Sequence, residues 1–375
     1  MMVFDIAGVF AQTESIPTAN WNSFVHTEKR ECNICIECVE NNLSEENTSV
    51  FQQHSELTVR GMPDGGWLFE SPPCFAPAQV LLMPDKKQII IHLPYCQEMR
   101  EQQTKLNHLL RTAFECRFCY EGIVSLHAAC VELDGFAVAF TGKSGLGKST
   151  RARAWVEGLG AQFISGDRPA VRLEKDGSVA CGVPWDGKEQ IFRDVERPLR
   201  CILEVRRSSA NYVRRLSEEQ ARQVLMQQSF VPMWDTDAAV MAMANVRGLI
   251  RRTPVYRVFC GPDAEDARVI YDILVNHPER IRKEEKEMKR KQGFVLRNVV
   301  DEYIVMPTGE NIAKFEGAVV LNEVSAFVFG QLENAVSRDD LLTAILNEFD
   351  VDEATAAADL DELLSQFGKM GLLED

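Results

Sequence analysis

The run 142–150, which reads GKSGLGKST, constrains the fold of this chain more than any other part of its sequence. It contains the complete pattern G-x-x-x-x-G-K-S. The apolar residues 136–141 precede it and predict a strand, and residues 149–159 have the pattern of a helix. A strand, a glycine-rich loop and a helix in this order predict a loop whose backbone N–H groups converge on phosphate oxygens.

The residue types in this loop match the needs of a bound nucleotide. Glycines keep side chains away from the phosphates, Lys148 can reach the β- and γ-phosphates, and the Ser149 hydroxyl can bind Mg²⁺. We therefore expect ATP and Mg²⁺ as cofactors, although the sequence does not separate ATP from GTP. The residues expected to bind the nucleotide are Gly142, Lys143, Ser144, Gly145, Leu146, Gly147, Lys148, Ser149 and Thr150.

The remainder of the first 278 residues predicts a mixed α/β core. Residues 1–98 contain short apolar runs separated by turn formers, a pattern typical of strands. Periodic apolar residues predict a helix over 99–121, Asp134-Gly135 predicts a hairpin turn, and residues 217–220 (SEEQ) form a capping box that opens another helix. Mixed strands and helices of this kind favour an α/β fold.

Three segments around the loop carry a resemblance to a known family. They are residues 125–135 (SLHAACVELDG), 163–168 (FISGDR) and 182–189 (GVPWDGKE). Together with the loop they are similar to the HPr kinase/phosphorylase family, over residues 120–275. The resemblance implies a P-loop kinase core with a fold akin to phosphoenolpyruvate carboxykinase. It also implies transfer of phosphate to a serine hydroxyl of a protein or peptide.

One position departs from the family pattern. Gly166-Asp167 stands where the family has two aspartates, of which the first is assigned to proton abstraction from the acceptor. Gly166 has no side chain for that role. Asp167 follows a predicted strand beside the loop, where a carboxylate suits Mg²⁺, so we expect Ser149 and Asp167 to bind the metal. The alternative for Asp167 is a turn or helix-capping carboxylate.

The sequence therefore leaves the identity of the general base open. Asp167 itself, Asp186, Glu189 and His127 are candidates, and the alternative for His127 is burial in an apolar strand. Lys188 is expected either to neutralise the transferring phosphate or to be a solvated surface lysine. The candidate catalytic residues are Asp167, Lys188 and His127.

Residues 301–375 hold 17 acidic and three basic side chains, which accounts for most of the formal net charge of −15. Such an asymmetry predicts a separate acidic module and counts against a nucleic-acid partner, because phosphates would be repelled. Strand signals followed by three amphipathic helices predict a small winged-helix domain over residues 294–375.

This module resembles the PqqD family. The matching segments are residues 312–315 (IAKF), 321–325 (LNEVS) and 363–373 (LLSQFGKMGLL). The resemblance implies binding of the leader segment of a ribosomally made precursor peptide, by addition of a strand to a sheet edge. A generic helical dimerisation or regulatory domain is the alternative, and a homo-oligomer stays open.

The nearly continuous charges of residues 279–292 (ERIRKEEKEMKRKQ) predict a solvated helical linker. We therefore divide the chain into four parts. Residues 1–98 are a β-rich region that packs on the core, and residues 99–278 are an HPr-kinase-like P-loop domain. Residues 279–293 are the charged linker, and residues 294–375 are a PqqD-like peptide-recognition domain.

The eleven cysteines include two spacings that zinc sites use, Cys32-x-x-Cys35-x-x-Cys38 and Cys116-x-x-Cys119. Both also fit the apolar faces of a strand and a helix, so we expect packed thiols rather than a metal site. The chain start lacks the basic region of a secretory signal, and no apolar run is long enough for a membrane helix. We therefore expect a cytoplasmic protein that does not bind a membrane.

These features predict an ATP-dependent kinase that phosphorylates a serine or threonine hydroxyl of a peptide or small protein docked by the C-terminal module. The alternative is a non-catalytic nucleotide-binding protein that recognises a peptide for a peptide-modifying system, which Gly166 favours. A metal-dependent redox protein built on the cysteines is a weaker third hypothesis.

Overall fold

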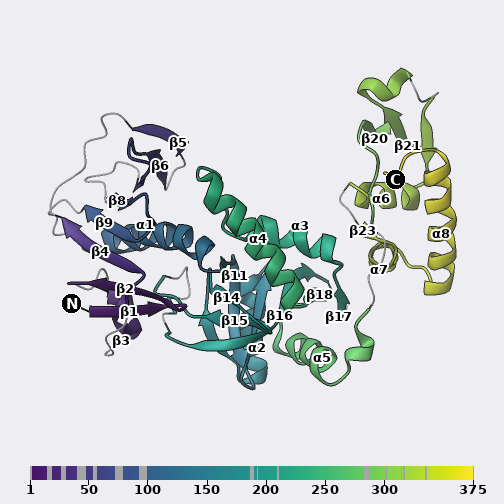
Figure 1. Cartoon of the computed structure of the whole chain (residues 1–375). Coiled ribbons are helices and arrows are strands. Elements are labelled where there is room, and N and C mark those ends of the chain that lie inside the picture. The colour runs from purple at the N-terminus through teal and green to yellow at the C-terminus, as the bar shows by residue number, and fades with distance from the viewer. Residues whose placement is uncertain are drawn as a thin grey trace. The chain divides into compact units, whose positions relative to one another are not determined.

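The computed structural model describes residues 2–14, 19–26, 31–39, 48–53, 57–71, 79–92, 99–185, 190–191, 193–208, 211–282, 287–299, 302–313, 315, 317–333 and 336–374. The chain divides into two compact units, Met1–Lys283 and Glu284–Asp375 (Figure 1). No described helix is long and apolar enough to cross a membrane.

The first sheet of unit 1 has the strand order β3-β1-β2-β4-β9-β8-β7-β6-β5. The strands are β1 (Met2–Ile6), β2 (Val9–Thr13), β3 (Val25–His26), β4 (Ile34–Val39), β5 (Ser49–Gln53), β6 (Thr58–Gly61), β7 (Trp67–Glu70), β8 (Gln79–Leu82) and β9 (Gln88–His92), with a 3-10 helix η1 (Ala19–Phe24) before β3. Phe4 and Ile89 of this sheet share one apolar core with Leu110 and Phe114 of helix α1 (Met99–Tyr120). The described part of residues 1–98 is therefore strand-rich and packs on α1.

The second sheet of unit 1 contains the glycine-rich loop. Its strand order is β10-β14-β15-β16-β12-β11-β13, and β18 pairs with both β16 and β17. The strands are β10 (Ile123–Ser125), β11 (Ala128–Leu133), β12 (Phe136–Thr141), β13 (Gln162–Ser165), β14 (Ala170–Glu174), β15 (Gly177–Cys181), β16 (Glu196–Arg207), β17 (Tyr212–Arg215) and β18 (Val255–Cys260).

Helices cover both faces of this second sheet. They are α2 (Lys148–Leu159), α3 (Glu218–Gln228), α4 (Thr236–Arg252) and α5 (Ala264–Val275), followed by a 3-10 helix η2 (Pro278–Arg280). Figure 1 shows α3 and α4 on one face and α2 and α5 on the other. Two separate apolar cores agree with this arrangement, one with Leu225 and Val246 and the other with Trp155 and Ile270. The architecture is thus mixed α/β, as the sequence predicts.

Two local predictions from turn and cap residues are confirmed. Asp134 and Gly135 join β11 to β12, and their φ angles of 52° and 82° are the positive values that a two-residue hairpin turn requires. The Ser217 side chain accepts a hydrogen bond from the Gln220 N–H at 3.1 Å, and the Gln220 side chain accepts one from the Ser217 N–H at 3.3 Å. This capping box begins α3.

The cysteine pair in α1 is buried, as expected for packed thiols. Cys116 and Cys119 have exposed fractions of 0% and 2%. In β4, Ile34 and Ile36 are buried, whereas Cys35 on the other face of the strand is half-buried. Within the described residues, no group of three or more His, Cys, Asp or Glu side chains is placed to hold a metal ion.

Unit 2 combines a three-stranded sheet with three helices. The sheet has the order β20 (Phe294–Val299), β21 (Glu302–Pro307) and β22 (Val319–Leu321), with a 3-10 helix η3 (Gly309–Ala313) before β22. The helices are α6 (Glu323–Gln331), α7 (Arg338–Glu348) and α8 (Glu353–Lys369), and β19 (Glu287–Met288) pairs with β23 (Val336–Ser337). Residues of all three helices share one apolar core with Phe294 and Val305. The three predicted helices are therefore confirmed.

The prediction of one helix over the charged run 279–292 is wrong, because Glu279 and Arg280 belong to the 3-10 helix η2 whereas Glu287 and Met288 form the strand β19. Besides the β19–β23 pairing, the Arg290 N–H donates to the Leu332 carbonyl at 2.8 Å. The Arg290 guanidinium also lies 5.3 Å from the centre of the Phe329 ring. Charge pairs along a helix contribute only about 0.2–0.5 kcal/mol each. Backbone pairing and a cation–π contact within unit 2 outweigh them, so residues 287–288 form a strand instead of a helix.

Candidate active site

The register of the second sheet brings five chain segments to one edge. β11 is antiparallel to both β12 and β13, whereas β16 is parallel to β12 and β18 is parallel to β16. The carboxyl ends of β12, β13, β16 and β18 therefore lie along the same edge as the amino end of β11. Ligands of α/β proteins bind at such an edge. The segments found there are the glycine-rich loop, Gly166-Asp167, Arg207-Ser208, residues 261–262 and His127.

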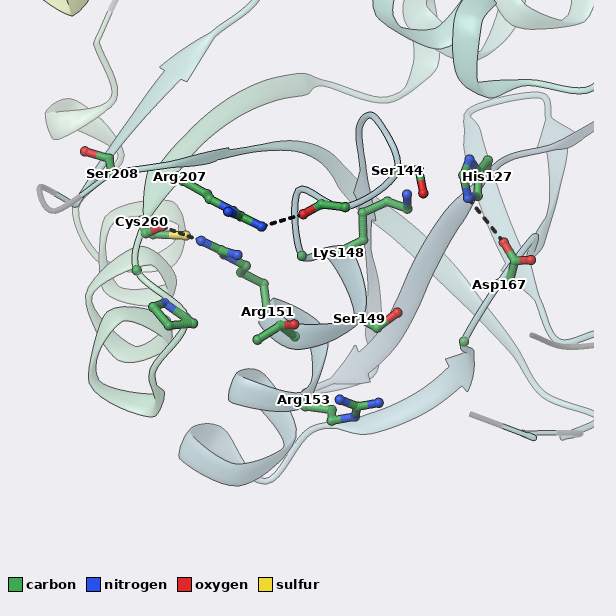
Figure 2. Close-up of a pocket in the computed structure, with 16 residues that line it drawn as sticks. His127, Ser144, Lys148, Ser149, Arg151, Arg153, Asp167, Arg207, Ser208 and Cys260 are labelled. Carbon is green, nitrogen blue, oxygen red and sulfur yellow. Dashed lines mark hydrogen bonds and ion pairs between the residues drawn. The ribbon is translucent and has the colours of Figure 1, made fainter. Parts of the chain in front are cut away.

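A cavity of about 1090 Å³ opens at this edge, and all five segments line it (Figure 2). Its lining residues are His127, Ser144, Gly145, Gly147, Lys148, Ser149, Thr150, Arg151, Arg153, Gly166, Asp167, Arg207, Ser208, Cys260, Gly261 and Pro262. Small-molecule sites commonly measure roughly 300–1,000 Å³. The cavity therefore has room for a nucleotide and part of a second reactant. Of the predicted nucleotide-binding residues, Gly142, Lys143 and Leu146 are not in its lining.

The glycines of the loop take backbone angles that other residues rarely adopt. The φ angles of Gly142, Gly145 and Gly147 are 136°, 83° and 89°. A Cβ at Gly147 would lie 2.3 Å from a terminal nitrogen of Arg151. Gly147 is also the residue that precedes α2, and among the described residues no side chain at this cap position bonds to the first N–H groups of that helix. Those N–H groups are therefore available to an anion.

Arg151 fixes the loop to the end of β18. One terminal nitrogen donates to the Leu146 carbonyl at 3.0 Å. The other donates to the Cys260 carbonyl at 2.8 Å (Figure 2). The residue is only 6% exposed. Sequence reasoning missed this role, because an arginine in the first turn of an amphipathic helix gives no signal of burial.

Lys148 and Ser149 both face the cavity. The Lys148 Nζ donates to the Gly142 carbonyl at 3.0 Å, within the loop itself. Burial lowers the pKa of Lys148 and Arg168 lowers it further, whereas Asp167 opposes the shift. A partly buried cation with a second cation nearby favours an anionic ligand. This is the electrostatic setting that a bound phosphate would satisfy.

His127 and Asp167 lie side by side in the lining of the cavity, with Nε2 of His127 3.7 Å from Oδ1 of Asp167 (Figure 2). The backbone holds both in place. The His127 N–H donates to the Gln228 carbonyl at 2.7 Å, and the Asp167 carbonyl accepts from the Ser165 hydroxyl at 2.7 Å. Burial and the Lys148 charge lower the pKa of His127, while Asp167 partly offsets them. His127 thus lies directly before β11 and lines the cavity, rather than being buried inside an apolar strand.

Arg207 ends β16 and reaches the loop from the side opposite His127. Its Nη2 donates to the Gly145 carbonyl at 2.6 Å (Figure 2). Sequence reasoning missed this residue too. The available signal was its position directly after an apolar strand parallel to the loop strand, since strand ends of that direction meet at the ligand-binding edge.

The donor set suits Mg²⁺ in part. Ser149 supplies a hydroxyl and Asp167 a carboxylate, and Mg²⁺ is bound by oxygen ligands from few protein groups together with substrate phosphates. Asp167 is the one carboxylate among the described residues of the cavity lining. Asp186, Lys188 and Glu189 lie outside the described residues, so their predicted roles stay predictions.

Comparison with protein families identifies the C-terminal part of the chain. Residues 302–373 match the family model for coenzyme PQQ synthesis protein D (PqqD). Unit 2 carries a PqqD domain. The resemblance predicted for this part of the chain is therefore confirmed, whereas a comparison with curated proteins gives no match.

Three solved structures are similar to parts of this chain. TbiB1 in complex with the TbiA(beta) leader peptide is 23% identical and covers 23% of this chain and 94% of its own, with a TM-score of 0.20. Lasso peptide synthetase B1 complexed with the leader peptide is 16% identical and covers 24% of this chain and 99% of its own, with a TM-score of 0.21. The HPr(Ser) kinase/phosphatase from Coxiella burnetii is 13% identical and covers 41% of this chain and 96% of its own, with a TM-score of 0.26.

Proposed function

We propose that this protein is an ATP-dependent kinase that phosphorylates a serine or threonine hydroxyl of a peptide bound by its PqqD domain. The observation that carries the proposal is the placement of Lys148, Ser149, His127 and Asp167 in one cavity at the end of the loop strand. The PqqD domain in the same chain supports a peptide as the acceptor, because the family resemblance implies binding of leader segments.

The glycine-rich loop would hold the triphosphate. Its N–H groups, the N-terminal end of α2 and the Lys148 ammonium all favour negative charge at the same place. Ser149 and Asp167 would hold Mg²⁺, which supplies neutralisation of the phosphate charge when it is bound. Phosphoryl transfer depends mainly on such positioning and charge stabilisation.

His127 takes the role that Gly166 cannot fill. The acceptor oxygen forms a bond to the γ-phosphorus while the bond from that phosphorus to the bridging oxygen of ADP breaks, and the hydroxyl proton must leave. Because its pKa is lowered, the His127 imidazole is neutral at pH 7 and can accept that proton. The Asp167 carboxylate, 3.7 Å away, stabilises the imidazolium that results.

The peptide would dock on the sheet of unit 2. Among the described strands, β22 pairs with β21 alone, so its other edge can accept an added strand. Val320 of β22 is 61% exposed and offers an apolar contact beside that edge. The 17 acidic residues of 301–375 favour a leader with basic or neutral side chains.

A second candidate is a nucleotide-binding recognition protein that transfers no phosphate. Gly166, in place of a carboxylate, is the observation that favours it. This candidate has the same nucleotide site and peptide site as the first, but it does not transfer phosphate to the peptide.

The test compares Lys148→Ala with Lys175→Ala. Lys175 is an exposed lysine in the turn between β14 and β15, is not in the cavity lining and serves as the control. Calorimetry should show that Lys148→Ala weakens binding of ATP with Mg²⁺ at least about 10-fold, the effect of removing one charged hydrogen-bond donor, and that Lys175→Ala does not.

The second measurement incubates wild-type protein with ATP, Mg²⁺ and the peptides that it captures. Mass spectrometry should detect one added phosphate on a captured peptide, and none with Lys148→Ala. Equal ATP affinity in wild type and Lys148→Ala would refute the nucleotide site. ATP binding without phosphate on any captured peptide would replace the kinase with the recognition protein.

A further inference from the structure

Arg207 is an exposed arginine whose side chain lies on the glycine-rich loop. Its Nη2 donates to the Gly145 carbonyl at 2.6 Å, and the residue lines the cavity (Figure 2). The strand that carries it, β16, is hydrogen-bonded to the loop strand β12, with Thr141 opposite Glu204. Arg207 is therefore held beside the loop by the sheet, although it is distant from the loop in sequence.

Lys148 is in the same situation as Arg207. Its Nζ donates to the Gly142 carbonyl at 3.0 Å, so both cations are bound to neutral carbonyl groups of one loop. Hydrogen bonds between ionised partners are roughly twice as strong as neutral ones, and guanidinium groups bind phosphate with two parallel N–H donors. Phosphate oxygens in the loop would therefore displace the carbonyl groups as acceptors for both residues.

Two neighbouring arginines, Arg151 and Arg206, bind other groups. Arg151 donates to the carbonyls of Leu146 and Cys260, which tie the loop to β18. Arg206 precedes Arg207 on β16 and forms an ion pair with the buried Glu204 at 2.7 Å. Successive residues of a strand point to opposite faces, so Arg206 and Arg207 serve different partners. Arg207 is the one of these three that is exposed, and among the described residues its side chain donates to the loop alone.

We propose that Arg207 is a ligand of the γ-phosphate. When ATP binds, its guanidinium leaves the Gly145 carbonyl and donates to γ-phosphate oxygens, and it neutralises the charge that develops there as the bond to ADP breaks. Arg207 keeps its protons throughout and forms no covalent bond. The inference rests on the proposed nucleotide site and adds a second cation that no sequence motif marks.

The test uses Arg207→Ala, Arg207→Lys and the control Arg200→Ala. Arg200 belongs to the same strand, but its guanidinium lies 5.6 Å from the Phe136 ring, at the start of β12 and away from the loop. Calorimetry with Mg²⁺ measures the affinities for ATP and ADP, and phosphate transfer to a captured peptide measures turnover. Thermal unfolding of each variant reports whether it folds.

We expect Arg207→Ala to weaken ATP binding about 10-fold or more while ADP affinity changes little, since ADP lacks the γ-phosphate. Turnover should fall about 100-fold or more, as when one donor to a developing charge is removed. Arg207→Lys should recover part of the ATP affinity but less of the turnover, because lysine is a point charge without paired donors. Arg200→Ala should match the wild type.

Three results would overturn the inference. Equal ATP affinity in Arg207→Ala and wild type refutes it while leaving the nucleotide site intact. Equal losses for ATP and ADP would show that Arg207 only shapes the loop through Gly145. A wild-type protein that binds neither nucleotide would refute the nucleotide site itself, and the role of Arg207 with it.

Discussion

The imidazole Nε2 of His127 lies 3.7 Å from the Asp167 carboxylate, although one residue directly precedes β11 and the other follows β13. Burial disfavours protonation of the imidazole most, and the charges of Lys148 and Arg168 add to this effect. The Asp167 charge and a hydrogen bond with Gln228 favour protonation. The net result is a pKa of His127 below its ordinary value, so the folded protein holds this residue neutral near pH 7.

This balance predicts an acid-dependent loss of stability. In the unfolded chain His127 has an ordinary pKa near ~6.5, so below that pH the unfolded state binds a proton that the folded state does not. The free energy of unfolding should therefore fall as the pH drops below about 6.5, until the folded pKa is passed. Denaturant unfolding at a series of pH values, compared between wild type and His127→Gln, isolates this contribution.

His127→Gln should show a shallower decline between neutral pH and pH 5 than the wild type. Asp167→Asn should show a larger decline, because it removes the charge that favours the imidazolium. Identical pH profiles in all three proteins would contradict the assigned environment of His127.

The loop glycines offer a second prediction, since Gly145 and Gly147 have similar φ angles of 83° and 89°. Alanine at either position costs about 1–2 kcal/mol for the left-handed backbone. At Gly145 a Cβ would meet nothing within 4 Å, whereas at Gly147 it would displace the Arg151 guanidinium. Loss of the Arg151 bonds to two carbonyls adds about 1–3 kcal/mol.

Gly147→Ala should therefore be the less stable variant, by an amount that urea unfolding curves can resolve. It should also lose ATP binding, because the loop is no longer tied to β18 through Cys260. If the two variants unfold at the same urea concentration, the Arg151 hydrogen bonds to the Leu146 and Cys260 carbonyls contribute nothing to the free energy of unfolding.

The cysteines give a third prediction, on thiol reactivity. Burial raises the pKa of Cys119 to about 12 and that of Cys201 to about 12, and it raises the pKa of Cys116 as well. The reactive species is the thiolate, so these thiols should resist iodoacetamide at pH 8 in the folded protein. Cys32 and Cys35, which are half-buried, should react first among the described thiols.

A time course of alkylation followed by peptide mass spectrometry checks the order. Labelling in urea should make all of these cysteines react at similar rates, which controls for intrinsic reactivity. Fast labelling of Cys116 or Cys119 in the folded protein would place α1 outside the packed core.

The sequence predicted the parts of the fold that local chemistry determines. The hairpin at Asp134-Gly135 and the capping box at Ser217 depend on residues adjacent in the chain, and both are present. The prediction of one helix over the charged run 279–292 was wrong because contacts distant in sequence determine the structure there. Its local pattern favours a helix, but Arg290 contacts Phe329 and Leu332, which a local pattern does not encode.

The residues of the candidate site also fall into two groups, those marked by a local motif and those that the fold brings together. Lys148 and Ser149 belong to a continuous motif, so their position beside a phosphate-binding loop follows from the sequence. Arg151 and Arg207 do not, because their partners are carbonyl groups of Cys260 and Gly145 that the sheet register brings near. His127 and Asp167 were predicted singly, and their contact depends on the antiparallel pairing of β11 and β13.

The last prediction concerns the coupling of the two units. Removing residues 284–375 cuts the chain at the boundary between the units. It also preserves two backbone hydrogen bonds of unit 1, in which the Arg282 N–H donates to the Val213 carbonyl and the Arg215 N–H donates to the Arg282 carbonyl. The truncated protein should therefore retain the cavity and its affinity for ATP, with the full-length protein as the reference in calorimetry.

Phosphorylation of the captured peptide should respond differently. A peptide docked on the PqqD domain gains an effective concentration at the cavity of up to about millimolar, so at ~1 µM peptide truncation should slow phosphate transfer by roughly 100-fold or more. At saturating peptide the two proteins should converge, because docking supplies local concentration rather than chemistry. Adding the separate fragment 284–375 in trans should not restore the rate. Equal rates at 1 µM peptide would show that the PqqD domain does not deliver the acceptor, whereas a deficit that persists at saturation would mean that unit 2 completes the active site itself.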